Sequence, residues 1–178
     1  KRLAEHTDII EFYRPHIQKK PDLPQLARQA GDFEYWIYHI LTKTSAPGIY
    51  RRLYWQNWLD GLSSVCAYWH FDSHAGGDGF NSFDGGKNTA DYGLVYSDEA
   101  SDQVIISRRL LAWYQGQMDF ALFEICRRQL DLAEAAKRPV ARQKAALQSL
   151  VEEGLSAGSI QLEQLHQKLL DLALELKK

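Results

Sequence analysis

Apolar residues recur at helical spacing along the second half of the chain, and this pattern constrains the fold more than any other feature. The leucines of residues 159–176 follow at alternating intervals of three and four: Leu162, Leu165, Leu169, Leu172 and Leu176. This spacing places them along one face of an α-helix. It is also the a/d pattern of a coiled coil, but about two heptads are fewer than a zipper needs. We therefore predict a buried bundle helix, whose last turns offer a contact for a homodimer.

Proline and glycine divide the rest of the chain into further segments with helical spacing. We predict helices at 1–13, 24–30, 33–43, 47–71, 97–138, 140–153 and 159–176, and a short strand at 94–96. One face of the longest helix is traced by Val104, Leu111, Tyr114, Met118, Leu122, Ile125 and Gln129. The predicted fold is all-α, a single domain over 1–178 built as a bundle of about six helices.

Residues 72–97 interrupt this pattern with a glycine-, aspartate- and asparagine-rich insert between the two longest predicted helices. Loops longer than ~12–15 residues are uncommon inside compact domains and are often functional. The aromatic residues of the insert include Phe80, Phe83 and Tyr92. Aromatic side chains in such a loop anchor it to the core or to a partner, so we expect a recognition surface here.

The net charge of -2 hides a separation of charge along the chain. Residues 72–102 contain seven acids and one lysine, whereas residues 127–144 contain six basic residues and two acids. The total does not indicate a strongly basic nucleic-acid binder or a polybasic membrane protein. No apolar run reaches the ~18–20 residues of a transmembrane helix. With only Cys66 and Cys126 a disulfide framework is not indicated, so we expect a reducing, cytoplasmic location.

Three side chains of metal-ligand type, His70, Asp72 and His74, stand two residues apart at the start of this region. Alternate residues of an extended chain point to the same side, so the three could converge on one zinc, iron or manganese ion. The alternative is that His70 closes a helix, where a cation is favourable, and that His74 is a solvated loop residue. Apart from such a divalent metal, we expect no cofactor.

Paired arginines mark three of the predicted helices. The pairs Arg51–Arg52 and Arg108–Arg109 are candidates for phosphate contacts with nucleic acid. A basic stretch that could bind an acidic protein partner is formed by Arg127, Arg128, Arg138 and Arg142. The alternative is that these are solvated arginines beside an aromatic core.

The leading functional hypothesis is a non-enzymatic regulatory or adaptor protein. It would bind a macromolecule through the aromatic residues of the insert and through the basic stretch. A metal-dependent enzyme, in which a metal-bound water is the nucleophile, is the first alternative. A nucleic-acid-binding protein is the second. No serine or cysteine nucleophile motif is visible, and both cysteines fall on apolar helix faces, as inert thiols do.

Overall fold

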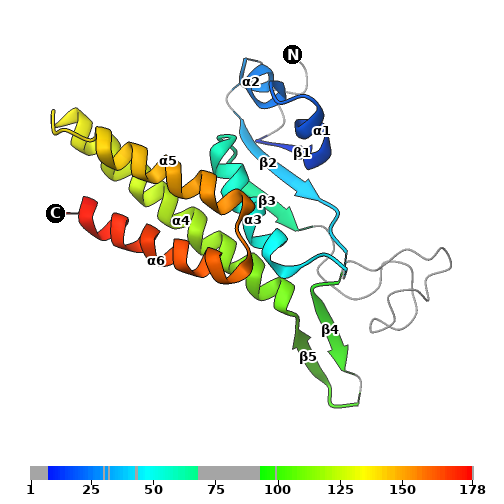
Figure 1. Cartoon of the computed structure of the whole chain (residues 1–178). Helices are drawn as coiled ribbons and strands as arrows, with labels where there is room; N and C mark the ends of the chain where they lie inside the picture. The colour runs from blue at the N-terminus through cyan, green and yellow to red at the C-terminus, as the bar shows by residue number, and fades with distance from the viewer. Residues whose placement is uncertain are drawn as a thin grey trace. The chain divides into compact units, whose positions relative to one another are not determined.

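The computed structural model describes residues 8–29, 31, 33–42, 44–67, 93–98 and 100–177 (Figure 1). The described elements are, in chain order, β1 (Ile9–Tyr13), α1 (Arg14–Lys19), α2 (Leu23–Arg28), β2 (Glu34–His39), α3 (Pro47–Leu59), β3 (Ser64–Ala67), β4 (Val95–Asp98), β5 (Gln103–Ile106), α4 (Arg108–Ala135), α5 (Ala141–Ser156) and α6 (Ser159–Leu176). They fall into two compact units. The sheet unit comprises residues 1–46 and 60–111, and the helical unit comprises residues 47–59 and 112–178.

Helices make up most of the structure, and the described part of the chain contains six of them. This confirms the helical character of the predicted fold. The prediction that the fold is all-α is wrong, because three strands form a parallel sheet and two more form an antiparallel hairpin.

The parallel sheet has the strand order β1-β2-β3. Its register aligns Tyr13 with Tyr38 and His39 with Ala67, so the carboxyl ends of the strands lie at one edge of the sheet. Parallel neighbours require a long crossover, and the chain uses α1 and α2 between β1 and β2, and α3 between β2 and β3. Helix α1 packs against β1 and β2.

The helices predicted over 1–13 and 33–43 are wrong where they overlap β1 and β2. Strand β2 reads EYWIYH, and aromatic and β-branched residues of this kind favour strands. Tyr35 and Ile37 are buried on one face, while Trp36 and Tyr38 are half-buried on the other. A strand covered on both faces lacks the alternation of apolar and polar residues by which a strand is recognised.

The helix predicted over 47–71 ends at Leu59. Gly61, which follows directly after the turn, has a φ of +67°, and glycine adopts this helix-ending conformation without steric cost. The chain then enters β3 instead of continuing as a helix.

The helix predicted from Ser97 begins at Arg108 instead. Residues 95–98 and 103–106 form the hairpin of β4 and β5. Strand β4 agrees with the strand predicted at 94–96, and it includes the last residues of the predicted insert. The side chain of Ser107 starts α4, since its Oγ accepts a hydrogen bond of 3.2 Å from the backbone N–H of Leu110.

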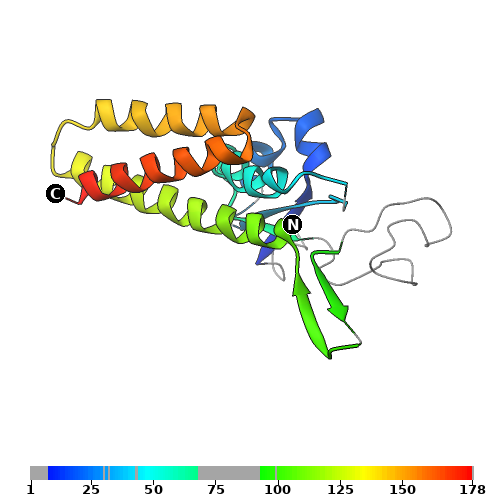
Figure 2. The same ribbon diagram turned by 60° about the horizontal axis from the view of Figure 1, so that its bottom comes forward.

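In the helical unit, α4, α5 and α6 run side by side (Figure 2). The predicted leucine face of α6 is buried in the core of this unit. Helix α4 points Tyr114, Met118 and Ile125 to solvent. Its buried face carries instead Gly116, Asp119, Phe123, Cys126 and Leu130. No helix in the described ranges is long and apolar enough to cross a membrane.

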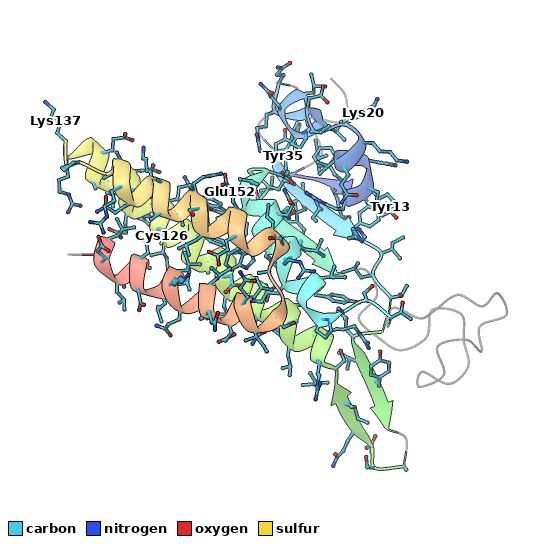
Figure 3. All side chains as sticks on the ribbon, in the orientation of Figure 1. Tyr13, Lys20, Tyr35, Cys126, Lys137 and Glu152 are labelled. Carbon is cyan, nitrogen blue, oxygen red and sulfur yellow. The ribbon has the colours of Figure 1, made fainter. Side chains whose placement is uncertain are left out.

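Cys126 behaves as the sequence predicts. Its side chain is fully buried in the core of the helical unit, at the position labelled in Figure 3. Burial raises the pKa of its thiol to about 11, so the thiolate is scarce at neutral pH and the thiol is inert.

Gly154 of α5 tests the packing of the helical unit. A Cβ at this position would lie 2.1 Å from Cε3 and 2.3 Å from Cζ3 of Trp55, which is fully buried. Helix propensity alone would make Gly154→Ala stabilising by about 1 kcal/mol. We expect the opposite sign, a loss of roughly 1–3 kcal/mol in the free energy of unfolding, measured by urea denaturation.

Ser149→Ala is the matched control, because Ser149 is an exposed position of the same helix. Its free energy of unfolding should stay within about 0.5 kcal/mol of the parent value. A Gly154→Ala variant at least as stable as the parent protein would contradict the close approach of α5 to Trp55.

Candidate functional site

The carboxyl end of the parallel sheet gathers aromatic and titratable side chains. Strand β1 ends at Tyr13, which is followed by Arg14, and β2 ends with Tyr38 and His39. Sheets of parallel strands joined by helices bind ligands beyond the carboxyl ends of their strands. We call this group, together with His16 of α1, the sheet-end site.

Tyr13 lies at the centre of the sheet-end site, at the junction of β1 and α1 (Figure 3). Its ring stacks on that of Tyr38 with 5.0 Å between centroids and meets His16 edge-on at 5.4 Å. The ring of His39 is 6.3 Å away. Such rings offer an apolar surface with polar tips, which suits the recognition of a small molecule.

His39 is the chemically distinctive member of the site. Its Nδ1 atom is buried and has no hydrogen-bond partner among the described residues. Burial, and secondarily the positive charge of Arg14, lower the pKa of His39 below its ordinary value of 6.5. The imidazole is therefore neutral at neutral pH, and a neutral imidazole can accept a proton or bind a metal.

Arg14 supplies a fixed positive charge beside His39. Its side chain is buried and forms an ion pair with the carboxylate of Asp60. Arg28 of α2 contacts the turn that contains Asp60 and Gly61, since its Nη2 donates a 2.6 Å hydrogen bond to the carbonyl oxygen of Gly61. Because Asp60 already binds its guanidinium, Arg14 acts on His39 through its charge.

The lowered pKa of His39 is directly measurable. An NMR titration of the imidazole should give a midpoint below 6.5. The unfolded chain takes up this proton first as the pH falls. The contribution of His39 to stability is therefore complete above about pH 6.5 and is lost as the pH falls through the folded pKa.

Arg14→Gln separates the two causes. Removing the guanidinium should raise the pKa of His39, but the pKa should stay below 6.5 because burial is the larger cause. A parent titration with a midpoint at or above 6.5 would contradict the burial of the imidazole.

A second polar group lies in the core of the helical unit around Asp119 of α4, which is fully buried. Its Oδ2 accepts hydrogen bonds of 2.6 Å from Arg51 Nε and 2.6 Å from Trp55 Nε1. Its Oδ1 accepts a hydrogen bond of 3.0 Å from Arg51 Nη2 and lies 2.6 Å from Nδ1 of His166. Each carboxylate oxygen thus has two partners, which come from α3 and α6.

These contacts give Asp119 and Arg51 a structural role. Burial alone would lower the pKa of Arg51, but the hydrogen bonds and charges of Asp119 and Glu163 outweigh it and raise the pKa. Arg51 remains charged and satisfied, and the acceptor atoms of Asp119 are filled. A ligand would have to displace one of these partners to reach the carboxylate.

Asp119→Ala should lower the free energy of unfolding by about 3–5 kcal/mol, because it removes the buried counter-charge of Arg51 and leaves only the exposed Glu163. Denaturant unfolding measures the loss. Asp131→Ala is the control, since Asp131 is an exposed acid on the same helix. It should cost no more than about 1 kcal/mol. Equal losses in the two variants would show that the buried network is not formed.

The arginines predicted to contact nucleic acid take different positions. Arg51 is buried against Asp119. Arg52 Nη1 donates a 2.6 Å hydrogen bond to the carbonyl oxygen of Ala157. Arg108 is exposed. Arg109 donates to the carbonyl oxygen of Gly93 and to the hydroxyl of Tyr96. Three of the four arginines thus form hydrogen bonds within the protein.

The predicted basic stretch is exposed. Arg127 pairs with Glu124 at 2.6 Å and with Asp131 at 3.5 Å, and its hydrogen bond to Glu124 is the main cause of its raised pKa. Arg128, Arg138 and Arg142 also face solvent. Near the turn that carries Lys137, labelled in Figure 3, a hollow of about 200 Å³ is lined by Ala133, Arg138, Pro139, Val140, Gln143, Glu175 and Leu176. Arg127 is held by its ion pairs more firmly than Arg128, Arg138 or Arg142. Binding of an acidic partner by these three arginines stays a prediction.

The remaining predicted residues lie outside the described residues: His70, Asp72 and His74 for the metal, and Phe80, Phe83 and Tyr92 for the partner. In the sequence, His70 comes three residues after Ala67, the last residue of β3. The described residues contain no group of three or more histidine, cysteine, aspartate or glutamate side chains that could hold a metal ion.

Neither His39 nor Asp119 is among the site residues proposed from the sequence. Asp119 does carry a signal, since Gly116, Asp119 and Phe123 continue the three- and four-residue spacing of a buried face. An acid on that face predicts a buried partner. His39 has no comparable local signal, because its position follows from the order and direction of the strands.

No protein-family model matches the chain, and no curated protein matches its sequence.

Proposed function

We propose that the sheet-end site is an enzymatic site in which neutral His39 exchanges a proton with a bound small molecule. The observation that carries the proposal is the buried Nδ1 of His39, which has no partner among the described residues. Unpaired buried polar atoms are costly and are often functional. The position of His39 at the carboxyl end of the middle strand supports the same reading.

The neighbouring side chains suggest a division of roles. The rings of Tyr13 and Tyr38 would bind the apolar part of the ligand. Burial, together with the charge of Arg14, would keep His39 neutral and so ready to accept a proton. A general base must be unprotonated at the working pH, and the lowered pKa of His39 meets this condition.

A metal-dependent reaction remains a proposal that is compatible with this site. His70, Asp72 and His74 follow β3 in the sequence, and the carboxyl end of β3 aligns with His39. A metal bound by these three residues would supply an activated water.

Recognition of a macromolecule by the helical unit is a second candidate, and the exposed side of α4 favours it. The side chains of Tyr114, Met118, Ile125 and Leu132 are exposed along this helix. The last three are spaced seven residues apart and therefore lie on one face. A row of large exposed apolar side chains is typical of an interaction surface, and the exposed Arg128 could add contacts with an acidic partner.

Ligand binding at His39 provides the test of the enzymatic proposal. The isotope-labelled full chain is titrated with a small-molecule fragment library and, separately, with ZnCl₂, while the imidazole resonances are followed by NMR. We expect ligands that shift His39 and the ring of Tyr13. In His39→Gln their Kd should rise about tenfold, which corresponds to one lost hydrogen bond.

His166→Gln is the control, because it changes a histidine outside the site and keeps a donor for Asp119. Its affinity should be unchanged. Zinc binding that shifts His39 and disappears in His74→Ala would support the metal-dependent form. If every ligand leaves the His39 resonances unmoved, or binds His39→Gln with equal affinity, the proposed site is wrong.

A further inference from the structure

The hairpin of β4 and β5 exposes an unusual amount of apolar side chain. Every residue of β5 is exposed, and Val104, Ile105 and Ile106 retain 62%, 41% and 57% of their accessible surface. Side chains alternate along a strand, so Val104 and Ile106 occupy one face and Ile105 the other. Both faces of the strand are therefore apolar and open.

One edge of β5 is also open among the described residues. Among the described residues, β5 pairs with β4 alone, in the two-stranded sheet seen in Figures 1 and 2. A two-stranded hairpin is only marginally stable by itself. Proteins usually protect such an edge with lysine, proline or a bulge. The sequence of β5, QVII, contains no lysine, no proline and no charged residue.

The charges that flank β5 select its partner. Asp102 directly precedes the strand, and Arg108 follows it by two residues; both are exposed. An antiparallel second copy centred on Ile105 would place Val104 opposite the partner's Ile106, and it would bring Asp102 to the end of the strand where the partner's Arg108 lies. A parallel copy would bring like charges together at both ends.

We infer that β5 pairs antiparallel with β5 of a second copy of this chain, forming a four-stranded sheet in the order β4-β5-β5-β4. The pairing adds backbone hydrogen bonds along the open edge and covers apolar side chains of both copies. Two symmetry-related pairs of Asp102 and Arg108 set the direction and the register.

Sedimentation velocity of the full chain over a range of concentrations tests this dimer. The parent protein should dimerise, and Val104→Lys should raise the Kd of the dimer by at least about tenfold, because it places two ammonium groups on the same face of the joined sheet, beside the partner's apolar side chains. Ile160→Lys is the control, since Ile160 of α6 is 81% exposed. It should leave the Kd unchanged.

A charge reversal at Arg108 tests the direction of pairing. Arg108→Glu places glutamate at the end of the strand where the partner's Asp102 lies and should raise the Kd about tenfold. Glutamate suits the first turn of α4, so the fold should be kept. Adding Asp102→Asn should recover most of the loss, and asparagine tolerates the φ of +51° at this position.

The outcomes separate clearly. A parent protein that stays monomeric at the highest soluble concentration overturns the inference. So does a dimer that weakens equally in Val104→Lys and Ile160→Lys, or in neither. An Arg108→Glu variant whose dimer is unaffected overturns the antiparallel arrangement. Loss in Val104→Lys and Arg108→Glu, with recovery on adding Asp102→Asn, supports it.

Discussion

The helical unit depends on one buried carboxylate. Asp119 of α4 is reached by donors from α3 and α6, and both of its oxygens have two partners. Hydrophobic packing tolerates small shifts between helices, whereas four hydrogen bonds to two atoms do not. The carboxylate therefore specifies how α3 and α6 are aligned on α4, and the leucines of α6 fill the space that this alignment leaves.

The outlines of the helices could be predicted from local signals. Pro139 and Gly158 flank α5 and α6 closely, and the leucine spacing of α6 identified its buried face. Strands β1 and β2 could not be predicted in the same way. Their aromatic and β-branched residues favour strands but do not exclude a short helix, and the middle strand β2 is covered on both faces and lacks alternation. Only the pairing of distant segments distinguishes the two structures.

The candidate site shows the same limit more sharply. His39 becomes significant because the register of the parallel sheet brings it beside Tyr13 and near Arg14. Each of these residues is ordinary in its local sequence. Arg51 and Arg52 were visible as a pair in the sequence, yet the structure uses Arg51 of α3 within the core. Spacing within one segment can identify residue types, but it cannot say which of them meet.

The path of the chain between the two units has a consequence for how this protein can be divided. The chain enters the helical unit at Pro47, leaves it after Leu59 and returns at Ala112. Arg51 and Trp55 belong to the first segment of the helical unit, and Asp119 belongs to the second. A fragment of residues 112–178 would therefore keep the carboxylate and lose its guanidinium. Although each unit is compact, neither is a module that recombination or truncation could separate from the other at a single point in the sequence.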